Sequence, residues 1–129
     1  MRKLITIIAA SMLLGCSSIV GLVPSFSDSN QSARIIDVRA DVDALDCSKP
    51  QEPQVAKIRD DLRWFELYSQ SAGVRHNDVI AIIQPMQETV NDMYNRVKVK
   101  DGSKAYCEIK KKLMATQAER AAKAILGRF

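Results

Sequence analysis

The chain has 129 residues, of which 47% are hydrophobic, 26% charged and 5% aromatic. This length suits one small domain and excludes a multidomain enzyme. The formal net charge is +4, from 19 Lys and Arg against 15 Asp and Glu. Two cations, Arg2 and Lys3, lie in a segment that we expect to be removed, which leaves a net charge of +2. A balance so close to neutral gives no indication of nucleic-acid binding.

Residues 1–15 have the layout of a secretory signal peptide. Arg2 and Lys3 precede an apolar run over residues 4–14. Such a run enters the bilayer while the cations stay at the cytoplasmic face. The run is shorter than the roughly 20 residues that span a hydrocarbon core. An uncleaved anchor over residues 4–23 is the alternative, although serines and glycines interrupt that longer stretch.

The end of this run resembles the bacterial lipobox, in which a small residue precedes a cysteine; here Gly15 precedes Cys16. The resemblance implies signal cleavage between these two residues and acylation of Cys16. Three acyl chains exceed what stable membrane anchoring requires. Because Ser17 stands where an aspartate would imply retention in the inner membrane, the resemblance implies sorting to the periplasmic face of the outer membrane.

Residues 16–50 are predicted to form a lipidated N-terminus, a flexible tether and an acidic extended arm. The stretch 24–32 is rich in Ser, Asp and Asn and has too few apolar residues to order itself. Residues 36–44 alternate apolar and polar side chains, which predicts an extended strand. This strand either lies along the domain or pairs with a strand of a partner.

Residues 51–129 are predicted to form a helical domain. Apolar residues recur every three or four positions over 53–71, 78–97 and 104–126, which predicts three amphipathic helices. Their matched lengths and short connections favour an all-α fold, a small antiparallel three-helix bundle. About 80 residues is close to the size at which a core alone is marginal, so a covalent link would help.

The ends of these helices carry recognisable signals. Gly73 is expected to end the first helix, Asn77 to cap the second and Ser103 to cap the third. Pro85 lies inside the second helix and is expected to kink or split it. The predicted apolar face of the third helix consists of Cys107, Ile109, Leu113, Ala118, Ala121, Ala124 and Ile125.

Three cysteines are present. With Cys16 acylated, Cys47 and Cys107 remain as an even pair in an oxidising compartment. In an up-down-up bundle, the starts of the first and third helices meet at one end, so we predict a Cys47–Cys107 disulfide; two free buried thiols are the alternative. No metal site is predicted, because structural zinc needs four ligands and only these two cysteines and His76 are available.

No catalytic arrangement is legible in the sequence, and we expect neither an enzyme nor a cofactor. His76, the only histidine, lies in a predicted turn and is expected to be exposed. Three carboxylates on the polar side of the first helix are expected to form solvated ion pairs with Arg59 and Arg63; they are Asp60, Asp61 and Glu66. The protein is therefore expected to act by binding.

Two features are candidates for binding. Trp64 and Tyr68 are four residues apart and stack on one helix face, where they belong either to the core or to a partner-binding patch. Residues 98–129 carry nine cations and three acids. This basic part is either a solvated face, a contact for the acidic arm, or a surface for an anionic partner. The candidate partner-binding cations are Lys110, Lys111 and Lys112.

Residues 14–24 resemble the start of small phage-encoded lipoproteins, including outer-membrane spanins, and residues 64–68 and 105–110 resemble phage lipoproteins without an assigned role. The resemblance implies a phage or prophage lipoprotein that binds a protein partner in the envelope, with a spanin-like role in host lysis. The alternative function is a lipoprotein that blocks a receptor in superinfection exclusion or assists envelope assembly.

Overall fold

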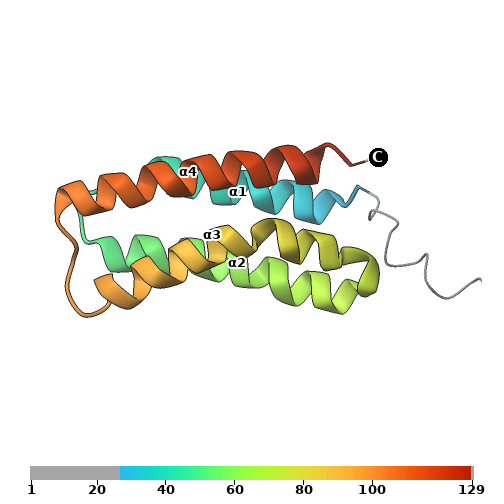
Figure 1. The fold of residues 1–129 in the computed structure, drawn as a ribbon, viewed down its shortest axis with the longest axis horizontal. Helices are drawn as coiled ribbons and strands as arrows, with labels where there is room; N and C mark the ends of the chain where they lie inside the picture. Colours follow the sequence, from blue (N-terminus) through green and yellow to red (C-terminus); the bar gives the residue numbers. More distant parts are fainter. Residues whose placement is uncertain (1–26, 129) are drawn as a thin grey trace, which may run out of the picture.

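Four α-helices make up most of residues 27–128, which are the residues that the computed structural model describes. The elements are α1 (Ser29–Ala44), α2 (Gln51–Ala72), the short 3-10 helix η1 (Val74–His76), α3 (Asn77–Val97) and α4 (Lys104–Leu126). Both α1 and α3 pack against α2 and α4, so the helices form a closed antiparallel bundle (Figure 1). The all-α fold is confirmed, but the predicted count of three helices is wrong, because α1 is a fourth.

The extended strand predicted over residues 36–44 is wrong, because this segment is the second half of α1. The buried side chains of α1 recur every three or four residues, as a helix requires; they are Gln31, Ile35, Val38 and Val42. Ile36, which the alternating pattern placed on the same face as Val38, is 45% exposed. The helical domain therefore includes residues 29–44.

The N-terminal cap explains where α1 begins. The Asp28 side chain accepts hydrogen bonds from the backbone N–H groups of Asn30 (2.8 Å) and Gln31 (3.2 Å). These bonds satisfy two of the donors that the first turn of a helix leaves free. The last residues of the predicted tether, 29–32, are consequently part of a helix; residues 16–26 lie outside the described part of the chain.

The other three helices follow the predictions closely. α2 begins two residues before the predicted start, and α4 has the predicted bounds, with the Ser103 side chain accepting a hydrogen bond from the backbone N–H of Tyr106 (3.1 Å). α3 continues through Pro85 as one helix, so the predicted split does not occur. His76, not Asn77, is the residue that precedes its first turn.

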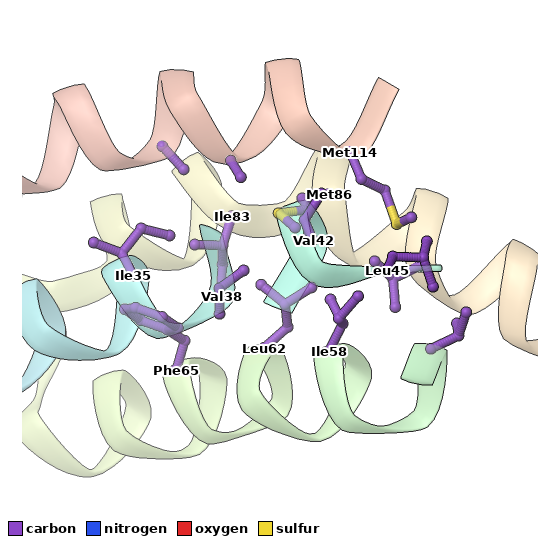
Figure 2. Close-up of a cluster of buried hydrophobic side chains, with 14 of the residues drawn as sticks. Ile35, Val38, Val42, Leu45, Ile58, Leu62, Phe65, Ile83, Met86 and Met114 are labelled. Carbon is purple, nitrogen blue, oxygen red and sulfur yellow. The ribbon is translucent and has the colours of Figure 1, made fainter. Parts of the chain in front are cut away.

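The core runs along the bundle axis, and all four helices contribute to it (Figure 2). Its largest apolar side chains with at most 1% exposure are Ile35, Ile58, Leu62, Phe65, Ile83, Met86, Met93, Met114 and Ile125. The predicted inner face of α4 is partly wrong. Ile109, Leu113 and Ala124 are exposed, whereas Met114 and Ala122 are buried. α1 and α3 flank α4, and they determine which of its faces is covered.

Gly73 ends α2 as predicted, with φ of 97° and ψ of −179°. This region of backbone space is essentially restricted to glycine. A Cβ added there would meet no atom within 4 Å, so any cost of a side chain comes from the backbone alone. We expect Gly73→Ala to lower the free energy of unfolding by about 1–3 kcal/mol. Urea unfolding measures this loss, and an unchanged midpoint would contradict the assigned conformation.

Candidate functional site at the disulfide end of the bundle

The predicted disulfide is confirmed. Cys47 in the connection between α1 and α2 is bonded to Cys107 in the first turn of α4, with a Cα–Cα distance of 5.7 Å. The α1–α2 and α3–α4 connections lie at the same end of the bundle (Figure 1). The bridge therefore fixes the first connection to the start of the last helix. We call residues 45–50 and 98–103, with the first turns of α2 and α4, the disulfide end.

Gln51 joins the second connection to the first. Its side-chain Nε2 donates to the Gly102 carbonyl (2.8 Å), and its Oε1 accepts from the Gly102 N–H (3.1 Å). Its backbone N–H donates to Asp101 Oδ1 (3.1 Å). Gln51 is only 2% exposed, so these bonds are shielded from water. The two connections thus form one ordered surface.

Truncating this side chain tests the link. We expect Gln51→Ala to lower the free energy of unfolding by about 1–3 kcal/mol, because it removes both side-chain bonds and leaves the Gly102 backbone groups without these partners. Gln70→Ala on the exposed face of α2 is the control, with an expected change within about 0.5 kcal/mol. Chemical denaturation measures both variants. Equal effects in the two would show that the Gln51 bonds contribute nothing.

Asp46 orders the first connection. Its carboxylate accepts hydrogen bonds from the Ser48 hydroxyl (2.5 Å) and the Ser48 backbone N–H (2.9 Å). The bond from the Ser48 hydroxyl has the larger effect and the bond from the Ser48 N–H the next, and they lower the pKa of Asp46 from 3.8 to about 2. The Asp46 backbone N–H donates in turn to Gln54 Oε1 (2.8 Å). The loop beside Cys47 is therefore held by side chains of the connection itself and by Gln54 of α2.

This lowered pKa predicts a defined pH dependence. The charged Asp46 stabilises the folded state fully above about pH 4, and the contribution is lost as the pH falls from about 4 to 2. Carboxyl NMR titration should give a midpoint near 2 for Asp46 in the folded protein. Ser48→Ala removes the hydroxyl donor and should raise that midpoint toward 3.8. A wild-type midpoint at or above 3.8 would contradict this.

The three candidate lysines have different surroundings. Lys110 Nζ donates to Asp92 (2.6 Å) on α3, and Lys111 Nζ donates to the Leu45 carbonyl (2.8 Å) at the end of α1. Both side chains are thus used within the fold. Lys112 is exposed on the outer side of α4. Of the predicted trio, only Lys112 points to a binding surface.

Sequence reasoning did not single out the connection between α3 and α4. Lys98, Lys100 and Lys104 are exposed around it. Val99 lies between the first two and is 83% exposed, more than any other large hydrophobic residue of the described chain. A hollow lined by residues 95–96 and 99–103 lies beside it. The sequence feature that could have identified this exposed surface is an aliphatic residue between two lysines in the connection between two helices.

Trp64 and Tyr68 lie elsewhere, on the second half of α2. Their rings stack at 4.6 Å with an interplanar angle of 12°. The Arg34 guanidinium of α1 lies 5.0 Å from the Trp64 ring. The Tyr68 hydroxyl donates to Asp28 Oδ2 (2.9 Å) and accepts from Asn30 Nδ2 (3.1 Å). Both aromatic residues hold the start of α1, and the structure does not bring them together with the lysines.

The predicted ion pairs of α2 are formed in part. Arg59 pairs with Asp60 at 3.0 Å. Asp61 pairs across the α1–α2 interface, with Arg34 (3.1 Å), and also with Lys57 (3.5 Å). Burial, and then the neighbouring Asp41 carboxyl, raise the pKa of Asp61 above its ordinary value. Asp61, Arg34 and Lys57 thus form an ion-pair cluster that links α1 to α2, and Asp61 is not part of a solvated pair on α2 alone.

A shallow groove of about 500 Å³ lies between α2 and α3, over the buried side chains of Leu62 and Val90. Charged and amide groups from both helices form its rim; they are Arg59, Asp60, Arg63, Glu66, Gln87 and Asn91. Two arginines are balanced by two carboxylates. The groove therefore has no net charge to select an ion of one sign.

His76 is half-buried, contrary to the prediction of an exposed turn residue, and its Nδ1 lies 3.1 Å from Gln31 Nε2 of α1. Within residues 27–128, no three His, Cys, Asp or Glu side chains are placed to hold a metal ion. None of the helices in this part of the chain is long and apolar enough to cross a membrane. Gly15 and Cys16 lie outside the described residues.

For residues 27–128, these observations define the class of the fold, an antiparallel four-helix bundle in which a disulfide joins the α1–α2 connection to the first turn of α4. Comparison of the chain with protein-family models, curated proteins and solved structures gives no match.

Proposed function

We propose that this protein is a lipoprotein of the bacterial outer membrane that binds a partner in the periplasm with the disulfide end of its bundle. Acyl chains on Cys16 would anchor it. The observation that carries the proposal is the direction in which the chain enters the bundle. The start of α1 lies at the end opposite to the Cys47–Cys107 bridge (Figure 1).

This direction gives the molecule two distinct ends. α4 has 23 residues, so the bundle is about 35 Å long. The chain from Cys16 to Ser27 can extend to at most about 40 Å. An anchor at Cys16 would thus hold the start of α1 near the membrane. The disulfide end would point away, up to about 75 Å from the bilayer surface.

Host lysis is the biological role that we propose for this arrangement. Its support is the resemblance of residues 14–24 to phage-encoded lipoproteins, including outer-membrane spanins. A phage lacking the protein should then fail to release progeny on time. The wild-type chain should restore release, and Cys16→Ala should not. Timely release without the protein would exclude a role in lysis.

Metabolic labelling tests the anchor itself. Cells producing the wild-type chain or Cys16→Ala are grown with labelled palmitate and fractionated. We expect label and outer-membrane location for the wild type and neither for Cys16→Ala. Ser17→Ala is the matched control and should keep the label, because it leaves the acylated cysteine intact. A wild-type chain without label that remains in the inner membrane would contradict the proposal.

A further inference from the structure

The charge of the described chain is unevenly distributed along the sequence. Residues 96–112 carry seven cations and two acids, a net charge of +5, whereas the rest of residues 27–128 has ten cations and thirteen acids. The overall +2 therefore combines a positive segment, from the end of α3 through the first part of α4, with a remainder of net charge −3. Such a concentration of cations gives the surface formed by this segment an attraction for anions.

The cations near the disulfide end differ in whether their side chains have partners within the fold. Asp92 binds Lys110, Asp46 binds Lys49, and the Leu45 carbonyl binds Lys111. Lys100, Lys104 and Lys112 are exposed. Lys98 is also exposed, but its Nζ donates to Asn95 Oδ1 (2.8 Å) and lies 5.8 Å from the Tyr94 ring. The acids among them are Asp101, which accepts the Gln51 N–H, and the exposed Glu108. The exposed lysines outnumber these acids.

Apolar side chains accompany these lysines. Val99 is 83% exposed at the tip of the α3–α4 connection, between Lys98 and Lys100. Ile109 is 69% exposed on α4, about one and a half turns beyond Lys104. Neither packs into the core of the bundle. We call Lys98, Val99, Lys100, Lys104, Ile109 and Lys112 the basic tip.

We propose that the basic tip docks onto the surface of an anionic phospholipid bilayer. The lysine ammonium groups would bind lipid phosphates, and Val99 and Ile109 would enter the boundary between headgroups and acyl chains. A polysaccharide or acidic peptide offers carboxylates, but no extended apolar phase for the aliphatic side chains. This inference rests on the proposed function, since an anchor at Cys16 makes the docked bilayer a second membrane facing the first.

Vesicle recruitment tests the docking. The full lipidated chain, purified from bacterial membranes, is incorporated into vesicles of phosphatidylcholine. Fluorescent vesicles with roughly one quarter phosphatidylglycerol are then added, and their capture is measured. We expect capture of these vesicles and not of neutral ones. Capture should disappear at about 0.5 M salt, where screening shortens the reach of charges.

Variants locate the surface. The triple variant Lys98→Gln, Lys100→Gln, Lys104→Gln should weaken capture by about 100-fold, from roughly fivefold per lysine. Val99→Ser should weaken it while leaving the charge unchanged. The matched control removes three cations elsewhere: Arg75→Gln, Arg120→Gln, Lys123→Gln. It should weaken capture by less than about tenfold. Equal losses in the two triple variants would overturn the proposal.

The remaining outcomes are also decisive. Stable incorporation without capture of anionic vesicles would overturn the docking and leave the anchor intact. Capture of purified wall polymer in place of vesicles would overturn it in favour of a saccharide partner. If the chain does not incorporate, the anchor fails, and flotation of the free chain with anionic and neutral vesicles decides the docking alone. Preference for anionic vesicles that depends on the basic tip would then still support it.

Discussion

Removing the Cys47–Cys107 disulfide should lower the free energy of unfolding by about 4 kcal/mol, because the bridge closes a loop with a sequence separation of 60 residues. That loss is comparable with the whole stability of many small domains, about 5–15 kcal/mol. The double variant Cys47→Ala, Cys107→Ala should therefore unfold at a much lower urea concentration than the wild type. Thermal unfolding should show the same ranking.

Reduction supplies the control for this prediction. A reducing agent should destabilise the wild type to nearly the level of the double variant, and it should leave the variant unchanged. Cys107 is completely buried, whereas Cys47 is only partly buried, so a reducing agent should attack the bridge at the Cys47 sulfur. A wild type whose unfolding midpoint is insensitive to reduction would contradict the contribution of the bridge.

A charge introduced on the inner face of α1 should be nearly as disruptive. Val38 is 0% exposed, whereas Ile36, two residues away, is 45% exposed. We expect Val38→Asp to lower the free energy of unfolding by about 2–7 kcal/mol, because it buries a polar group without a partner. Ile36→Asp is the matched control, with an expected loss below about 1 kcal/mol.

This pair of variants separates the helix from the strand that the alternating pattern predicted. In a strand, Ile36 and Val38 lie on one face, so both substitutions would have similar effects. In α1 they lie on different faces, and only one contacts the core. Denaturant unfolding followed by circular dichroism gives both values. Equal losses would mean that α1 is not docked as a helix.

The sequence could have indicated α1, but two signals conflicted. Apolar residues at 36, 38, 40, 42 and 44 match a period of two, and those at 35, 38 and 42 match a helix. Asp28 followed three residues later by Gln31 is the pattern of a helix N-terminus. The cap and the helical spacing agree with each other, and α2 and α4 offer a surface for the resulting face.

The helices after residue 50 were predictable because local signals and packing coincide. Gly73 and Ser103 mark ends that no neighbouring helix alters. The disulfide followed from the same reasoning, because the starts of α2 and α4 meet at one end in three-helix and four-helix bundles alike. The buried face of α4 was harder to predict. Its weak apolar pattern leaves the choice to the packing of α1, and Ile109 and Leu113 remain outside.

The candidate site shows where sequence reasoning reaches its limit. A run of three lysines does not reveal that Lys110 and Lys111 have partners on α3 and at the end of α1. Nor does the spacing of Trp64 and Tyr68 reveal that both side chains contact residues of α1. These partners are far away in the sequence and become neighbours only in the bundle. The exposed lysines near Val99 were visible as residue types, but not as one surface.

The most direct test of the central claim is the mass of the intact protein purified from cell membranes, followed by mapping of its peptides. We predict that the chain begins at Cys16, that Cys16 carries three acyl chains, and that one peptide pair is joined by Cys47 and Cys107. These findings would define an anchored molecule with an oxidised outer end. A chain that retains residues 1–15, or an unmodified Cys16, would contradict the account.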